Sequence, residues 1–320
     1  MDDALLTVED LAVQFHIGGR LFSGSRVLHA VNGVNLTVRA GECLGLVGES
    51  GCGKSTVALA ILGLVPAARG AITLDGMTIG VGAVDRRRLA RTVQMVFQDP
   101  YASLNPRQTV HRTLAAPLRL HGVINKGEVE DRVADMMGRV GLTPDHADRY
   151  PHEFSGGQRQ RIGIARALIL RPRLVICDEP VSALDVSIRA QIINLLLELK
   201  ESLGLSYIMI SHDLGVVEHM SDRVAVMYFG RIVESGNWRA IFERPGHPYT
   251  RGLIAAIPDP FAPAGSAADK VRGEIPSPFD PPSGCAFHPR CPIVVDKCRA
   301  APGPELRPLG AEHEASCWLA

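Results

Sequence analysis

Residues 48–56, with the sequence GESGCGKST, constrain the fold of this chain more than any other segment. They fit the phosphate-binding loop pattern, in which a glycine and four further residues precede Gly-Lys-Ser. An apolar run, 44–47, precedes the loop and a helix-like stretch, 56–64, follows it. Glycines let backbone N–H groups close around phosphate oxygens, and the following helix points its positive end at the anion. The strand and helix make an ordinary glycine-rich turn the weaker interpretation, and the chain is expected to bind a nucleoside triphosphate.

Each loop residue has an expected task. Lys54 should reach the β- and γ-phosphates, and the Ser55 hydroxyl should ligate Mg²⁺. The other residues that should surround the nucleotide are Gly48, Glu49, Ser50, Gly51, Cys52, Gly53 and Thr56. Cys52 also suggests sensitivity to thiol reagents, which inhibition by N-ethylmaleimide with and without ATP would test.

Apolar runs alternate with helical patterns up to about residue 235, which predicts a mixed α/β sheet domain. Residues 174–177 and 207–210 are unbroken apolar runs, as in central parallel strands that are buried on both faces. Residues 191–203 have helical spacing, and 224–227 with 231–233 predict a closing hairpin around Gly230.

Strand signals disappear between about 105 and 170, where 128–140 reads as an amphipathic helix, so a helical insertion is expected there. Seven prolines between 258 and 282 predict an extended connector, 258–284, into a small C-terminal module. The expected domains are therefore 1–245, with the helical part at about 105–170, and 246–320.

The apolar run 174–177 ends in Asp178 and Glu179, at the edge where open α/β sheets bind ligands. Asp178 is expected to hold Mg²⁺ through water, and Glu179 to orient the attacking water or accept its proton. The alternative is a pair of solvated carboxylates at a strand end, which the apolar strand makes less favourable.

A second cradle for an anion is predicted at Ser155, Gly156, Gly157 and Gln158, at the start of a helical stretch, 159–170. A chain with one triphosphate site does not need a second cradle of its own. This one is therefore expected to face the nucleotide of a neighbouring subunit, and a plain helix N-cap is the alternative.

Six motifs in this order resemble the nucleotide-binding subunits of ABC transporters: GESGCGKST, VFQDP, FSGGQ, LVICDEP, SALD and SHD. The resemblance covers about residues 5–235 and implies a P-loop NTPase of ABC type, with a RecA-like core and a helical insertion. It implies that Gln98 links Mg²⁺ and the water to the transmembrane contact and that Glu179 is the catalytic carboxylate. It also implies that His212 touches the γ-phosphate and Asp185 lies at a dimer interface. Phe15 lies about where the family stacks an aromatic ring on adenine, although Phe22 is nearby.

Residues 96–107, VFQDPYASLNPR, together with HPYTRGLIAAIP and GCAFHPRCP in the tail, resemble the ATPases of dipeptide and oligopeptide importers, in their F-type form. The resemblance implies peptide import driven by ATP hydrolysis. It also implies a D-type ATPase partner, two membrane permeases, an extracytoplasmic binding protein and a place at the cytoplasmic face of the membrane. Nickel and glutathione importers use the same subunit type, and a soluble ABC ATPase of DNA repair or translation is the rival from another class.

Charge and hydropathy agree with this interpretation. Lys and Arg total 34, as do Asp and Glu, so nothing indicates a nucleic-acid partner. The longest apolar stretch, 57–68, contains Pro66 and is too short to span a bilayer.

Four of the seven cysteines cluster near the C-terminus and are separated by five, six and eighteen residues: Cys285, Cys291, Cys298 and Cys317. Four thiols in a proline-rich module too small for its own core indicate a fold organised by metal. Zinc sites usually show pairs about two to four residues apart, which are absent, so a [4Fe–4S] cluster is favoured. The resembling importer subunits carry such a cluster there. Zinc and no metal stay open. If the metal is zinc, His288 and His313 are possible further ligands; otherwise both are expected to be surface polar residues.

Overall fold

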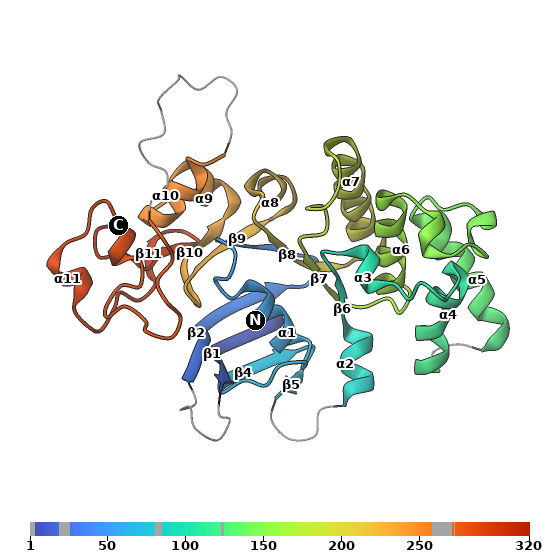
Figure 1. Ribbon diagram of the computed structural model, residues 1–320, viewed down its shortest axis with the longest axis horizontal. Coiled ribbons are helices and arrows are strands. Elements are labelled where there is room, and N and C mark those ends of the chain that lie inside the picture. Colours follow the sequence, from blue (N-terminus) through green and yellow to red (C-terminus); the bar gives the residue numbers. More distant parts are fainter. Residues whose placement is uncertain (1–3, 19–25, 81–84, 123–124, 258–270, 272) are drawn as a thin grey trace. The chain divides into compact units, whose positions relative to one another are not determined.

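Strands and helices alternate along the chain, and in the computed structural model they group into two units (Figure 1). The structure describes residues 4–18, 26–80, 85–122, 125–257, 271 and 273–320. The first unit comprises Met1–Leu5, Val38–Glu42 and Ala83–Met209, and the second Leu6–Thr37, Cys43–Gly82 and Ile210–Ala320. The predicted boundary at 245 stays a prediction; residues on both sides of it belong to the second unit. Phe22 and 258–270 lie outside the described residues.

The first unit contains a short parallel sheet. Strands β6 (Val93–Val96) and β7 (Leu174–Asp178) pair in parallel, with Val93 opposite Leu174. Strand β8 (Ser206–Ser211), whose first four residues belong to this unit, is the other neighbour of β7. Both β7, up to Cys177, and β8 are buried, as their unbroken apolar runs predict. Asp178 and Glu179 therefore lie at the carboxyl end of a central strand.

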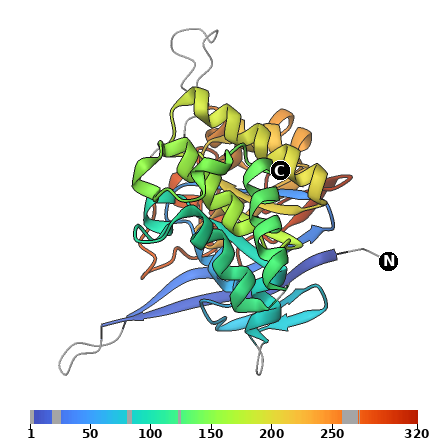
Figure 2. The ribbon, with the colours of Figure 1, turned by 90° about the vertical axis from the view of Figure 1, so that its right-hand side faces the viewer.

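Helices make up the rest of the first unit. No strand occurs among the described residues between β6 and β7, which confirms the predicted helical insertion. Helices α4, α5 and α6 pack against one another (Figures 1 and 2). Their amphipathic patterns place the apolar side chains of each in a shared core. The helices are α2 (Arg86–Thr92), α3 (Pro100–Ser103), α4 (Val110–His121), α5 (Lys126–Arg139), α6 (Gly156–Leu168) and α7 (Val186–Leu203), with 3-10 turns at Pro144–His146 and Pro151–Glu153.

The second unit has an antiparallel sheet that the sequence patterns did not indicate. Its strand order is β2 (Arg26–Arg39), β1 (Ala4–Ile17), β4 (Arg69–Leu74) and β5 (Met77–Ile79). In β1 and β4, Leu6 lies opposite Leu74 and Val8 opposite Ile72, and all four side chains are buried. Cross-strand apolar pairs of this kind hold one face of the sheet against a core.

The other sheet of the second unit contains the phosphate-loop strand β3 (Cys43–Val47), which pairs in parallel with β9 (Arg223–Tyr228). Strands β9 and β10 (Arg231–Asn237) form the predicted hairpin. The sheet continues with β12 (His313–Ala315) and β11 (Arg307–Gly310), which the proline-rich tail did not predict. The helices are α1 (Lys54–Ile61), α8 (Leu214–Met220), α9 (Trp238–Glu243), α10 (Pro248–Ile254) and α11 (Asp296–Arg299), with a 3-10 turn, η4, at His288–Arg290.

The C-terminal region does not stand alone, because its aromatic side chains enter the core of the β9–β10 hairpin. Phe287 is 2% exposed and its ring lies 5.2 Å from that of Tyr228 and 5.4 Å from that of Tyr249. A fully buried carboxylate, Glu234 on β10, accepts hydrogen bonds from the backbone N–H groups of Gly246 and His247. The C-terminal region is too short to form a hydrophobic core of its own, and it packs its apolar side chains into the core of the β9–β10 hairpin.

None of the described helices is long and apolar enough to cross a bilayer.

Replacing Phe287 with Ala should destabilise the protein by about 3–5 kcal/mol, because a large side chain is removed from a packed core. Urea-induced unfolding followed by circular dichroism would measure the loss. Leu64, which is exposed, provides the matched control, and Leu64→Ala should change stability by less than about 0.5 kcal/mol. Equal effects of the two substitutions would contradict the shared core.

Candidate functional site for nucleotide binding

The phosphate loop is pressed against two neighbouring strands. Gly48 and Gly53 have φ angles of 153° and 111°, in the region that favours glycine. A Cβ atom at Gly48 would lie 2.1 Å from the carbonyl oxygen of Met227, and one at Gly53 would lie 2.5 Å from that of Ala30. Neither position can accept a side chain, so the glycines are needed for packing as well as for access to phosphate.

The ammonium group of Lys54 is hydrogen-bonded to the backbone of the phosphate loop itself. Lys54 is buried, and its ammonium donates hydrogen bonds to the carbonyl oxygens of Gly48, at 2.7 Å, and Glu49, at 3.0 Å. Ser55, in the first turn of α1, is exposed, as are Ser50 and Gly51. A hydroxyl oxygen is the kind of ligand that Mg²⁺ accepts, and a helix start with free N–H groups suits an anion.

In the first unit, the structure brings two of the predicted catalytic residues together. The side-chain amide of Gln98 donates a hydrogen bond of 2.7 Å to the carboxylate of Glu179. Glu179 directly follows β7 and has a φ angle of 48°, which is unusual for a residue with a side chain. Such backbone strain concentrates at functional sites. Asp178, the last residue of β7, is half-buried.

The predicted second cradle is a capping box. Ser155 is the N-cap of α6: its hydroxyl oxygen accepts from the N–H of Gln158, while its own N–H donates to the Gln158 side chain. Ser155 and Gly156 are nevertheless exposed. A Cβ atom at Gly157 would lie 2.5 Å from the Cγ2 atom of Ile188, so this glycine allows α6 and α7 to pack closely. Ser155 is thus a helix N-cap and is also exposed, so the plain N-cap and the anion cradle do not exclude one another.

Three further predicted residues lie on the surface of their own units. Asp185 is the N-cap of α7 in the first unit and is exposed, and the next residue, Val186, is 80% exposed. His212 follows β8 in the second unit and is exposed. Phe15 is an exposed aromatic side chain on β1, as a ring that stacks on a base would need to be.

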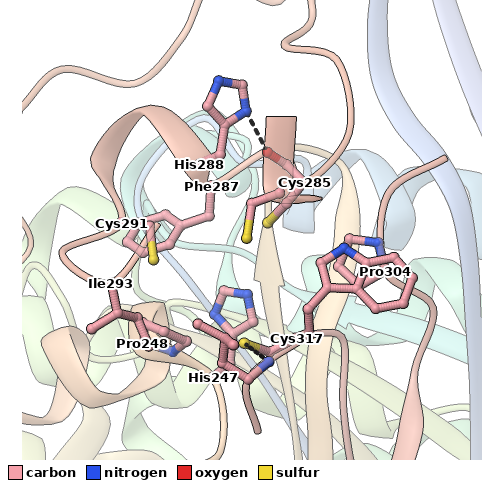
Figure 3. A pocket seen from close by; sticks show the side chains of 12 residues that line it. His247, Pro248, Cys285, Phe287, His288, Cys291, Ile293, Pro304 and Cys317 are labelled. Atoms are coloured by element: carbon pink, nitrogen blue, oxygen red, sulfur yellow. Dashed lines mark hydrogen bonds between the residues drawn. The ribbon is translucent and has the colours of Figure 1, made fainter. Parts of the chain in front are cut away.

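The four C-terminal cysteines line one cavity in the second unit (Figure 3). The sulfur atoms of Cys285, Cys291 and Cys317 face the same space in Figure 3, and Cys298 completes the set. His247, Phe287, His288 and Trp318 are other lining residues. His313 is not one of them; it is buried and bonded to Glu234 at 2.8 Å, so the prediction that it is a surface residue is wrong.

Burial disfavours the thiolate form of two cysteines of this cavity. Burial raises the pKa of Cys285 to about 11, and nearby thiols at Cys298, Cys291 and Cys317 add to the effect. Burial also raises the pKa of Cys291. Among the described residues, no group of three or more His, Cys, Asp or Glu side chains is arranged to hold a metal ion. The two observations are compatible, because thiols can share a cavity without converging on one point.

Two residues that sequence reasoning did not single out contact the phosphate loop. Arg290 forms an ion pair with Glu49, with N–O distances of 2.6 and 2.9 Å, and the hydroxyl of Tyr249 accepts a hydrogen bond from the Glu49 N–H. Both residues lie in the tail stretches HPYTRGLIAAIP and GCAFHPRCP. Those stretches carry the resemblance to the importer ATPases. Nothing in their local sequence indicates that they contact Glu49, which lies 200 residues or more away in the chain.

Comparisons with known proteins agree with this geometry. Residues 31–182 match the family model described as ABC transporter, and residues 233–298 match the oligopeptide/dipeptide transporter, C-terminal region. The chain is 52% identical to the oligopeptide transport ATP-binding protein OppF of Salmonella typhimurium, over 98% of this chain and 95% of that protein. It is 46% identical to the di/tripeptide transport ATP-binding protein DppF of Pseudomonas aeruginosa, over 98% and 97%.

A solved structure supports the same fold. The ATP-binding cassette MJ0796, in a dimeric post-hydrolysis state bound to ADP and Pi, matches with a TM-score of 0.64 and 26% identity. The match covers 73% of this chain and 99% of that one.

The burial of Cys52 argues against the predicted sensitivity to thiol reagents. Its side chain is buried, and burial raises the pKa of the thiol despite the nearby ammonium of Lys54. N-Ethylmaleimide should modify Cys52 at least about tenfold more slowly in the folded, nucleotide-free protein than in urea, because the thiolate is scarce and enclosed. Mass spectrometry of peptides over a time course would measure the rate. Similar rates in both states would show that the loop opens freely.

Proposed function

This chain belongs to the ATP-binding subunits of oligopeptide and dipeptide ABC transporters, and we propose that its described residues bind and hydrolyse ATP to power peptide import. ATP hydrolysis in this family is coupled to transport through membrane permeases. The observation that carries the catalytic assignment is the 2.7 Å hydrogen bond between Gln98 and Glu179 at the end of β7. Relatives named for oligopeptides and di/tripeptides favour peptide cargo over nickel or glutathione.

The proposed chemistry places few demands on the protein beyond position and charge, because phosphoryl transfer needs little covalent help. Lys54 reaches the β- and γ-phosphates from inside the loop. Glu179 orients the attacking water or accepts its proton, and Gln98 holds the carboxylate in place. His212 contacts the γ-phosphate, and Phe15 stacks on the adenine.

Bound Mg²⁺ would supply positive charge that offsets the charge of the phosphates. The oxygen atoms of Ser55 and Gln98 are the proposed ligands, and Asp178 would hold the ion through water. Their hydroxyl, amide and carboxylate chemistry suits this cation.

A second subunit completes each site in this proposal. The exposed start of α6, with Ser155, Gly156, Gly157 and Gln158, faces the nucleotide of the partner, and Asp185 with the exposed Val186 lies at the interface. The proposed partner is a D-type ATPase. The two would dock at the cytoplasmic face on two permeases, through the surface near residues 98–105, and an extracytoplasmic binding protein would deliver the peptide.

Glu179→Gln should reduce ATP hydrolysis by the assembled transporter at least about 100-fold, because the amide cannot accept a proton. It should leave ATP binding intact and trap an ATP-bound dimer, which size-exclusion chromatography with labelled ATP would detect. Glu201→Gln, on the exposed end of α7, is the matched control and should keep normal turnover. Unchanged turnover in Glu179→Gln would refute the assigned role, and full activity of a dilute monomer would refute the shared site.

For the cysteine cavity, a [4Fe–4S] cluster is the proposed occupant, held by Cys285, Cys291, Cys298 and Cys317. Each thiolate of such a cluster binds a different iron, so the four sulfur atoms stay further apart than around one ion. A zinc ion would instead need all four sulfurs about 2.3 Å from a single point, and the described residues offer no such group. Bound iron would also favour the thiolate form that burial disfavours.

Anaerobically purified protein should therefore contain iron and acid-labile sulfide in equal amounts and absorb broadly near about 400 nm. Cys298→Ser should lower the iron content strongly, whereas Cys177→Ser, in the buried strand β7, should not. Stoichiometric zinc without iron would support the alternative occupant, and a metal-free protein that folds normally would refute both.

A further inference from the structure

The phosphate loop is tied to the C-terminal region through one residue, Glu49. The guanidinium of Arg290 donates to both carboxylate oxygens of Glu49, from Nη1 at 2.6 Å and from Nη2 at 2.9 Å. The Arg290 side chain is only 5% exposed and that of Glu49 is 27% exposed. A bidentate, largely buried pair of this kind fixes orientation as well as distance.

The backbone of Glu49 is held at both of its polar groups. Its N–H donates to the hydroxyl of Tyr249 at 2.8 Å, and its carbonyl oxygen accepts from the ammonium of Lys54 at 3.0 Å. Tyr249 is 0% exposed, and its ring lies 4.7 Å from that of Tyr228. The C-terminal region therefore reaches the lysine of the loop through a single intervening residue.

Arg290 itself is positioned by the cysteine cavity. It ends the turn η4 (His288–Arg290). Cys285, three residues before the turn, and Cys291, directly after it, both line the cavity. The ring of His288 donates from Nδ1 to the carbonyl oxygen of Cys285 at 3.0 Å, and the N–H of Cys291 donates to the carbonyl oxygen of His288. The turn that carries Arg290 is therefore hydrogen-bonded to two cysteines of the cavity.

We propose that Arg290 and Tyr249 are positioning residues for the phosphate loop, and that the order of the cysteine cavity thereby sets the affinity of the chain for nucleotide. A loop that is already held in its binding shape does not lose conformational freedom when nucleotide arrives, so it binds more tightly. Arg290 and Tyr249 contact Glu49, which has no proposed role in the chemical step. Their effect should fall on binding and leave the chemical step largely unchanged.

Nucleotide binding by the full-length chain tests the first part of the proposal. Arg290→Met should weaken binding of Mg-ADP, measured by isothermal titration calorimetry, by about tenfold. Arg290→Lys should recover part of the loss, since it restores charge but not the bidentate fork. Arg299→Met changes an exposed arginine of the same region and should bind normally. Tyr249→Phe keeps the buried ring, removes the acceptor for the Glu49 N–H and gives a second, smaller loss.

Turnover by the assembled transporter separates positioning from a general loss of structure. Arg290→Met should raise KM for ATP by the same factor as the dissociation constant and leave kcat within about twofold. Unchanged binding in both Arg290→Met and Tyr249→Phe would overturn the proposal. A fall in kcat without a change in KM would also overturn it.

The proposed link between the cysteine cavity and nucleotide affinity is tested by Cys298→Ser, with and without Arg290→Met. Only this experiment rests on the proposed [4Fe–4S] cluster. If the cavity acts through Arg290, Cys298→Ser should weaken Mg-ADP binding in the otherwise unchanged chain and add little in the Arg290→Met chain. Equal losses in both backgrounds, or no loss in either, would refute the link. Iron analysis of the same samples reports separately on the occupant, and an iron-free chain would leave the effect of Arg290→Met in place.

Discussion

Close backbone contact between the phosphate loop and its neighbouring strands is the constraint on which the second unit depends. Side chains are excluded at Gly48 by the carbonyl oxygen of Met227 and at Gly53 by that of Ala30. The carbonyl oxygen of Cys52 accepts a hydrogen bond from Gly230, in the turn between β9 and β10, at 2.9 Å. The loop can adopt this shape only when β2 and the β9–β10 hairpin are in place, so strands far apart in the sequence fix a motif that looks local.

The same hairpin anchors the C-terminal region, which explains how a short tail can reach the loop. Glu234 on β10 is 0% exposed, and its carboxylate accepts from the N–H groups of Gly246 and His247 and bonds to the ring of His313 on β12. A buried carboxylate without partners would be costly, so these bonds determine where the chain leaves β10 and where β12 returns to it. Tyr249 and Phe287 then share one core with Tyr228 and Val233 of the hairpin.

Local sequence patterns predicted those parts of the fold that are determined by residues close together in the chain. The loop motif, the apolar strands β7 and β8, the hairpin and the helical insertion each have a signal in the sequence, and each is present in the structure. The hydrogen bond between Gln98 and Glu179 was not predictable from spacing, because 81 residues separate its partners and only the pairing of β6 with β7 brings their ends together.

Predictions failed where a long-range partner decides the environment of a residue. His313 was predicted to be a polar surface residue, but its bond to Glu234, 79 residues away, buries it. The strands of the tail were hidden for the same reason: β12 exists only because β10 offers an edge to pair with, and three residues carry no pattern of their own. The ion pair of Arg290 with Glu49, across 241 residues, is the extreme case.

The lysine of the phosphate loop and the helix starts proposed to meet the partner's nucleotide differ in burial. Lys54 is buried and bonded to loop carbonyl oxygens, and the N–H, the carbonyl oxygen and the carboxylate of Glu49 all have partners, so the chain's own groups hold the loop. Ser155, Gly156 and Asp185 are instead exposed at helix starts, where only their own helices fix them. If a second chain supplies the missing half of each site, this asymmetry is what the arrangement requires, because groups that must meet a partner's ligand cannot be enclosed by their own fold. Control over nucleotide affinity would then reside in the enclosed half, where Arg290 and Tyr249 contact Glu49.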